Sequence, residues 1–205
     1  MDAEAEFDEL LARYAASDDV AERSRMDDEL WARFGTDGAV FISDMSGFSR
    51  TTRALGIAHF LSHIHEMRPI IARAIGEHSG ILLKAETDNC YAYFREVDDA
   101  LNASMQVNAE LAERNRGKAD PDKMFVSIGI DYGRLLLIGE LEFFGDPVNT
   151  ASKLGEDLAA RSEILLTRRA MDQVTGDFEK EPDKRQERIS GIDIDYVAFD
   201  MAIRA

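Results

Sequence analysis

Two aspartates of this chain stand where a divalent-cation site is chemically possible. Asp44 follows the apolar, strand-like run 39–43, and Asp88 lies in a short polar segment between two further strand-like runs. Carboxylate oxygens suit hard cations, and Mg²⁺ in proteins typically uses one or two carboxylates together with substrate phosphates. Gly47 follows Asp44 closely and lets backbone N–H groups approach a triphosphate. Because a carboxylate at a strand end is commonly just solvated, the site depends on the elements that bring the two aspartates together.

The elements around the aspartates follow a definite order: strand, helix, strand, strand, helix, strand. This order predicts an α+β protein with a ferredoxin-like βαββαβ core, in which both helices cover one face of an antiparallel sheet. The first and third strands are central neighbours in such a sheet, so we expect Asp44 and Asp88 to lie close together. Hydrophobic periodicity predicts the strands over 39–43, 81–84, 90–94 and 125–130 and the helices over 57–75 and 97–114.

Further elements flank this core on both sides. At 205 residues the chain suits one main domain. Two short amphipathic patterns over residues 1–35 predict a pair of helices, and we expect an N-terminal helical extension over 1–36 and the main domain over 37–205. A C-terminal extension is expected to contain strands over 134–138 and 164–166, helices over 147–158 and 168–174, and a strand pair near 188–190 and 196–203.

The composition excludes several classes of function. A formal net charge of −16 repels nucleic acid and anionic membrane surfaces, since both require lysine and arginine to replace counterions. The single cysteine, Cys90, excludes an intramolecular disulfide and fits a reducing compartment. No apolar stretch approaches the roughly 18 residues that a bilayer span needs. We therefore expect a cytoplasmic protein that binds neither nucleic acid nor a membrane, and that would need a cation or oriented N–H groups to hold a polyphosphate.

Three segments resemble the signature motifs of the class III adenylyl and guanylyl cyclases, in a divergent, bacterial-type form. The segment 41–49, Phe-Ile-Ser-Asp-Met-Ser-Gly-Phe-Ser, resembles the first metal motif, and 84–88, Lys-Ala-Glu-Thr-Asp, resembles the second. The segment 144–154 is similar to the third signature, Gly-Asp-x-Val-Asn-x-Ala-x-Arg. Their order over a βαββαβ pattern, across roughly residues 38–200, favours this fold family.

The resemblance implies a nucleotidyl cyclase. Such an enzyme converts a nucleoside triphosphate to a 3′,5′-cyclic mononucleotide and pyrophosphate, by attack of the ribose 3′-hydroxyl on the α-phosphorus. Two Mg²⁺ or Mn²⁺ ions suit this reaction, because one lowers the pKa of the hydroxyl and the other neutralises the triphosphate. By analogy, Asp44 and Asp88 bridge both ions and the Met45 carbonyl adds a ligand. The first motif also implies substrate contacts from Ser46, Gly47 and Phe48.

The resemblance further implies a head-to-tail homodimer, in which each active site takes its metal aspartates from one chain and its remaining residues from the other. In that second half, Asn149 orients the ribose and Lys153 neutralises charge at the α-phosphate. Lys84 and Glu142 contact the base as a hydrogen-bond donor and an acceptor. One donor and one acceptor suit adenine and make ATP the expected substrate, while GTP and pyrimidine nucleotides stay open.

The sequence departs from the family pattern at three places. Lys153 replaces an arginine and lacks the planar fork that can hold two phosphate oxygens at once. The run 190–195 contains no basic residue where the family has a triphosphate-binding lysine, and the segment 133–142 is shorter than the usual hairpin. One alternative is therefore a degenerate cyclase-fold domain that binds a nucleotide or a partner without turnover. The retention of two costly neighbouring carboxylates argues against that alternative. Another alternative is an unrelated ferredoxin-like binding module, for which the three motifs would be a coincidence.

Overall fold

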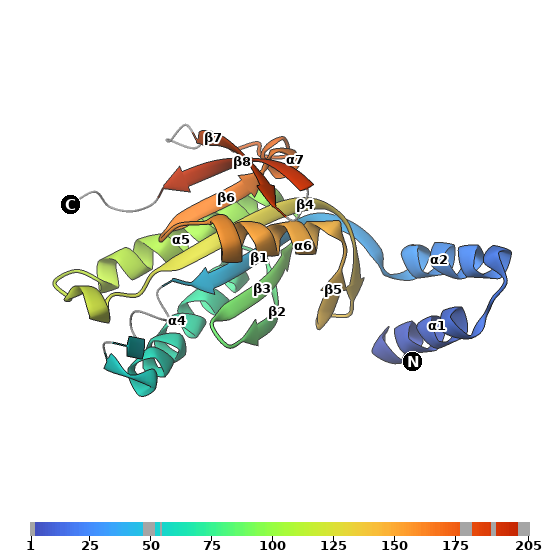
Figure 1. Ribbon diagram of the computed structural model, residues 1–205, viewed down its shortest axis with the longest axis horizontal. Coiled ribbons are helices and arrows are strands. Elements are labelled where there is room, and N and C mark those ends of the chain that lie inside the picture. Colours follow the sequence, from blue (N-terminus) through green and yellow to red (C-terminus); the bar gives the residue numbers. More distant parts are fainter. Residues whose placement is uncertain (1–2, 47–51, 54, 177–181, 190–191, 201–205) are drawn as a thin grey trace.

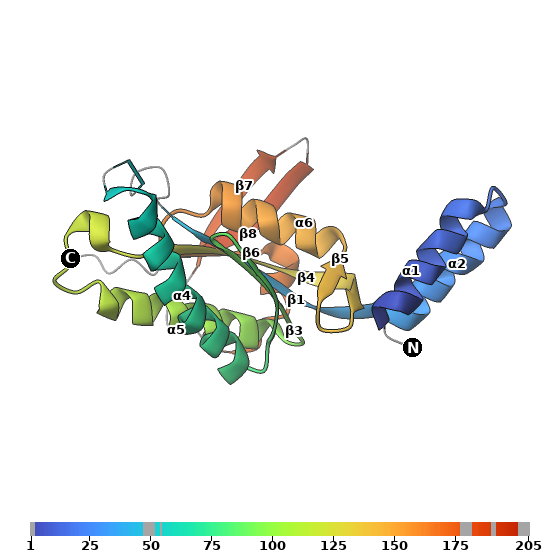
Figure 2. The same cartoon turned by 90° about the horizontal axis from the view of Figure 1, so that it is seen from below.

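The first two helices form an antiparallel hairpin that projects from one end of the sheet (Figures 1 and 2). The computed structural model describes residues 3–46, 52–53, 55–176, 182–189 and 192–200. Helix α1 spans Ala3–Ala16 and α2 spans Val20–Phe34. The Asp19 carboxylate caps α2 by accepting a hydrogen bond from the Ala21 N–H at 2.9 Å. The two predicted helices are present, and the division of the chain near residue 36 stays a prediction.

The sheet has the predicted ferredoxin-like core. Its first four strands lie in the order β2-β3-β1-β4, and each neighbouring pair is antiparallel. Strand β6 then pairs with β4 in parallel, and β8 and β7 extend the same sheet. The strands are β1 (Gly35–Met45), β2 (Ile81–Glu86), β3 (Asn89–Phe94), β4 (Val126–Ile138), β5 (Glu142–Phe144), β6 (Glu163–Thr167), β7 (Asp183–Ile189) and β8 (Ile192–Asp200).

Two long helices cover one face of the sheet, as the βαββαβ order predicts (Figure 2). Helix α4 (Ile57–Glu77) and helix α5 (Val97–Arg114) bury their apolar stripes against the sheet. Cys90 is buried in this core, and burial raises the pKa of its thiol to about 11. Among the described residues, no helix is long and apolar enough to cross a bilayer.

The opposite face is covered by α6 (Asp146–Ser152) and by the hairpin of β4 and β5. Here the backbones come unusually close together. A Cβ atom on Gly129 of β4 would lie 2.2 Å from the Ala151 carbonyl oxygen, and one on Gly155 would lie 2.7 Å from the Ile42 carbonyl oxygen. Glycine is therefore required at both positions, and the chain after α6 is pressed directly onto the centre of the sheet.

Several boundaries differ from the sequence-based expectation. The helix predicted over 168–174 ends at Met171, and the strand pair predicted near 188–190 and 196–203 is β7 (Asp183–Ile189) and β8 (Ile192–Asp200). The predicted strands 125–130 and 134–138 are one strand, β4, because Gly133 pairs with Gly38 and the ladder with β1 continues through it. The predicted helix 147–158 is a short α-helix followed by a π-helix over Lys153–Leu158. The hairpin turn between β2 and β3 is only Thr87 and Asp88, with Thr87 in the left-handed region at φ 48°.

Candidate active site

Asp44 and Asp88 lie together at the end of the two central strands. Asp44 is the second-last residue of β1, and the register that pairs Ser43 with Cys90 brings the strand end beside the β2–β3 turn. The pKa of Asp44 is raised to about 7, chiefly because the carboxyl is partly buried and then because Asp88 and Glu156 add negative charge. The expected meeting of the two aspartates therefore follows from the fold, while their role in metal binding stays a prediction.

Glu156 is a third carboxylate at this place, and the sequence did not indicate it. Its Oε1 accepts hydrogen bonds from Asn89 Nδ2 at 3.1 Å and from the Tyr91 hydroxyl at 3.3 Å. The π-helix places it there: the Ala159 N–H bonds to the Leu154 carbonyl, five residues back, so the widened turn redirects the side chains that follow Lys153. No periodicity in the sequence marks such a turn.

The donor set at this end of the sheet suits a divalent cation. The Asp44 carboxyl has a pKa raised to about 7 by burial and by neighbouring carboxylates, and a cation that replaces its proton relieves this repulsion. Among the described residues, no three acidic, histidine or cysteine side chains are grouped closely enough to hold one ion together. Glu156 therefore acts on the two aspartates through its charge and through its bond to Asn89, the neighbour of Asp88.

The two residues expected to read the base lie on neighbouring strands of one chain, close enough for their charges to interact. Lys84 lies on β2 and Glu142 on β5, and the charge of Glu142 is among the causes that raise the pKa of Lys84. The largest cause is a hydrogen bond with Glu86, whose Oε2 lies 2.5 Å from Lys84 Nζ. A donor and an acceptor are thus present side by side, and Glu86 competes with any ligand for the lysine.

Asn149 and Lys153 lie four residues apart at the end of α6 and share one side of that helix. They line a cavity of about 380 Å³ together with Asp146 and Glu156. Neither Asp44 nor Asp88 lines that cavity. The structure therefore places the predicted residues in three groups: Asp44 and Asp88 at the strand ends, Lys84 and Glu142 on β2 and β5, and Asn149 and Lys153 at the end of α6.

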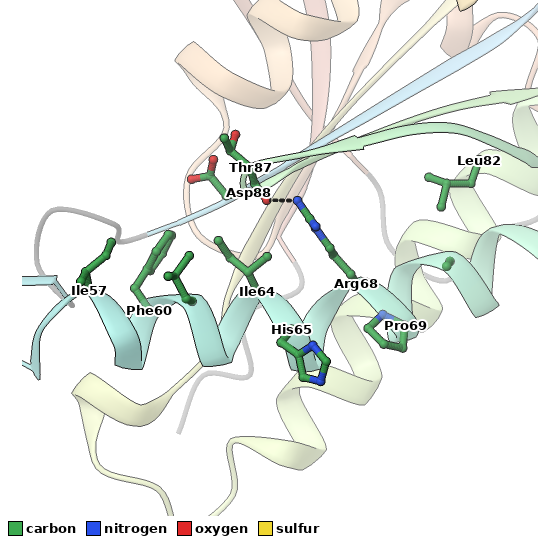
Figure 3. A pocket seen from close by; sticks show the side chains of 11 residues that line it. Ile57, Phe60, Ile64, His65, Arg68, Pro69, Leu82, Thr87 and Asp88 are labelled. Carbon is green, nitrogen blue, oxygen red and sulfur yellow. Dashed lines mark hydrogen bonds between the residues drawn. The ribbon is translucent and has the colours of Figure 1, made fainter. Parts of the chain in front are cut away.

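A larger, mainly apolar groove of about 830 Å³ runs between α4 and strand β2, and Thr87 and Asp88 of the β2–β3 turn are among its lining residues (Figure 3). Arg68 reaches across from α4 and donates a hydrogen bond to the Thr87 carbonyl at 2.5 Å. This bond ties the β2–β3 turn to α4 and so helps to fix the backbone next to Asp88.

Comparison with solved structures identifies the fold. The chain is similar to the adenylate/guanylate cyclase/hydrolase from Silicibacter pomeroyi, with a TM-score of 0.68 and 20% identity over 80% of this chain and 96% of that chain. The adenylyl cyclase CyaB from P. aeruginosa gives a TM-score of 0.64 and 17% identity, over 83% and 96% of the two chains. The chain has the class III nucleotidyl cyclase fold.

A third structure with the cyclase fold was solved with a nucleotide. It is the guanylate cyclase domain of RhGC from Catenaria anguillulae in complex with GTP, with a TM-score of 0.65 and 15% identity over 79% of this chain and 94% of that chain. No protein-family profile and no curated protein matches the sequence. The resemblance drawn from three short motifs is thus confirmed as a fold.

Two further residues of the first motif, Met45 and Ser46, lie beside β4 at the end of β1. The Met45 side chain is buried, so its backbone is the part that can face the two aspartates. The Ser46 N–H donates to the Phe125 carbonyl at 3.0 Å, and its hydroxyl shares a hydrogen bond with Ser127 at 3.1 Å. The predicted substrate contacts of Gly47 and Phe48 lie outside the described residues.

Proposed function

We propose that the protein is a nucleotidyl cyclase that converts a nucleoside triphosphate, preferably ATP, to a 3′,5′-cyclic mononucleotide and pyrophosphate. The observation that carries the proposal is the pair Asp44 and Asp88 at the ends of the central strands of a cyclase fold, with the pKa of Asp44 raised to about 7. Crowded, partly buried carboxylates are costly for folding, and groups with such raised pKa values are common at functional sites. We place the protein in the cytoplasm, on the basis of its single cysteine and its acidic composition.

Asp44, Asp88 and the Met45 carbonyl would hold two Mg²⁺ or Mn²⁺ ions. When bound, such ions lower the pKa of the ribose 3′-hydroxyl and neutralise charge on the triphosphate. The chain itself keeps the two carboxylates in place: Arg68 anchors the turn next to Asp88, and Glu156 holds Asn89. The charge of Glu156 also increases the attraction of the site for cations.

The second half of the site comes, in this proposal, from another copy of the chain. Asn149 would orient the ribose, and Lys153 would neutralise charge at the α-phosphate as a single ammonium group. Asn149 and Lys153 line a cavity that neither Asp44 nor Asp88 lines, and a head-to-tail dimer would bring the two pairs together across the interface. A homodimer with two equivalent sites follows from that arrangement.

The base preference rests on Lys84 and Glu142. Their proximity offers one donor and one acceptor, which matches the edge of adenine. Because guanine and cytosine also combine donors with acceptors, GTP and pyrimidine nucleotides are the alternatives. The bond between Lys84 and Glu86 and the replacement of an arginine by Lys153 favour a second candidate, a cyclase-fold domain that binds nucleotide without turnover.

The test is a product assay with ATP, GTP, CTP and UTP, each with Mn²⁺ or Mg²⁺, at protein concentrations that allow dimerisation. The proposal expects a cyclic product, and expects Asp44→Ala to abolish it. Asp37→Ala is the matched control, because Asp37 is an exposed aspartate on the same strand. Nucleotide binding without product for all four bases would establish the degenerate domain instead.

A further inference from the structure

A buried carboxylate on β4, the strand against which α6 packs, is fixed in place by four hydrogen bonds. Asp131 of β4 is completely buried. Its carboxylate accepts bonds from Arg169 Nε at 2.7 Å and from the Tyr132 N–H at 2.8 Å, and further bonds from Arg169 Nη2 and the Thr167 hydroxyl. A buried charge must be paired, and this pairing raises the pKa of Arg169 and holds its guanidinium against the sheet.

The same guanidinium also reaches the helix that carries Asn149. Arg169 Nη2 donates to Asp146 Oδ2 at 2.6 Å, and Asp146 is the first residue of α6. Helix α6 has only seven residues, and a helix this short depends on tertiary contacts for its position. Asn149 follows Asp146 by three residues, and Lys153 begins the π-helix directly behind.

We infer that Arg169 is a positioning residue. It links Asp146, in the first turn of α6, to buried Asp131, and it thereby fixes the positions of Asn149 and Lys153. The inference rests on the proposed function, and none of the three motifs indicated Arg169. The Asp146 side chain is 68% exposed, so its ion pair contributes little to the stability of the fold. Its effect is on placement, and a displacement of about 1 Å can slow a reaction as much as 10²-fold.

The test removes the ion pair between Arg169 and Asp146 and leaves the pair between Arg169 and Asp131 intact. In Asp146→Ala, Arg169 still pairs with Asp131. We expect kcat to fall about tenfold, with KM and metal affinity unchanged, because positioning acts on the transition state. We expect Asp146→Glu to recover part of the activity, because its carboxylate can still reach Arg169. Asp172→Ala is the control, since it breaks the exposed ion pair with Arg168 at 3.2 Å and is expected to keep wild-type activity.

A second readout needs no turnover. Hydrogen–deuterium exchange of the peptides that cover 146–153 should be faster in Asp146→Ala than in the wild type, and unchanged in Asp172→Ala. Wild-type kcat and wild-type exchange in Asp146→Ala would overturn the inference, as would an equal loss of metal affinity and kcat. A wild-type protein without cyclic product would remove the proposed function, and the exchange experiment would then still decide whether Arg169 holds α6.

Discussion

Asp44 has a strongly raised pKa, which reflects the crowding of carboxylates at the site. The carboxyl is partly buried, and Asp88 and Glu156 add like charges, so the neutral form is favoured and the pKa rises from 3.8 to about 7. An acid whose pKa is raised in the folded state contributes stability below its ordinary pKa. It loses that contribution as the pH rises through the folded value. Above pH 7, the metal-free protein therefore carries an unfavourable charge at this position.

The first prediction concerns this charge. When a chelator keeps the protein free of metal, Asp44→Asn should raise the melting temperature at pH 8. Near pH 3.5 it should leave the melting temperature unchanged, because the folded wild-type protein then has a protonated, neutral carboxyl at this position. For roughly 1 kcal/mol of relieved repulsion, after screening by solvent, the shift is about 2–4 °C for a chain of this size. Thermal unfolding across this pH range measures the effect, and Asp37→Asn should show no such shift. A gain of equal size at both pH values would contradict the assignment.

The second prediction is that protons and divalent cations compete for the same carboxylates. Below pH 7 the affinity for Mn²⁺, measured by calorimetry without nucleotide, should fall about tenfold for each pH unit, because one proton must leave when the ion binds. Glu156→Gln should move the midpoint of this pH dependence to lower pH, since one like charge is removed while an oxygen acceptor for Asn89 remains. An affinity that does not change between pH 6 and pH 8 would exclude Asp44 as a ligand.

At the scale of elements, sequence patterns predict those helices and strands whose positions are determined by residues close together in the chain. The stripe of helix α5 gives its bounds, Val97–Arg114, correctly. The motif aspartates were found in the same way, because each lies beside a strand whose pattern is clear. Glu156 and Arg169 were missed, because their places depend on contacts across the sheet and on a π-helix that no periodicity marks. The strands 125–130 and 134–138 were predicted separately, although the ladder with β1 runs through Gly133 between them.

The third prediction tests the close packing of α6 and the π-helix on the sheet. In Gly129→Ala the new methyl group would meet the Ala151 carbonyl and the Gly155 backbone, and neither can move aside without shifting the helix. Overpacking of this kind costs about 1–3 kcal/mol, so thermal unfolding should occur several degrees lower. Gly76→Ala is the control, because a Cβ there meets no atom within 4 Å and alanine favours the helix. An unchanged melting temperature for Gly129→Ala would mean that the packing is looser than described.

At the scale of the whole molecule, the N-terminal hairpin packs on β4 and on β5, the strand that carries Glu142, which is proposed to contact the base. The Phe7 ring stacks on Phe144 of β5 with centroids 5.8 Å apart, and the Arg134 guanidinium lies over the Trp31 ring at 4.4 Å. Glu142 lies on the same short strand as Phe144. A displacement of the two helices would therefore move the strand that faces Lys84, although the division of the chain into these two parts stays a prediction.

The last prediction tests whether two chains complete one site. Asp44→Ala removes the metal half and Asn149→Ala removes the second half, so each variant alone should be inactive. When equal amounts are mixed and allowed to exchange, half of the dimers pair one variant with the other, and each of those has one intact site. The mixture should therefore recover about a quarter of the wild-type activity. Mixing Asp44→Ala with Asp88→Ala is the matched control, because both changes damage the same half and no intact site can form. Recovery in the first mixture alone places the two halves on different chains, and an inactive first mixture would place them on one.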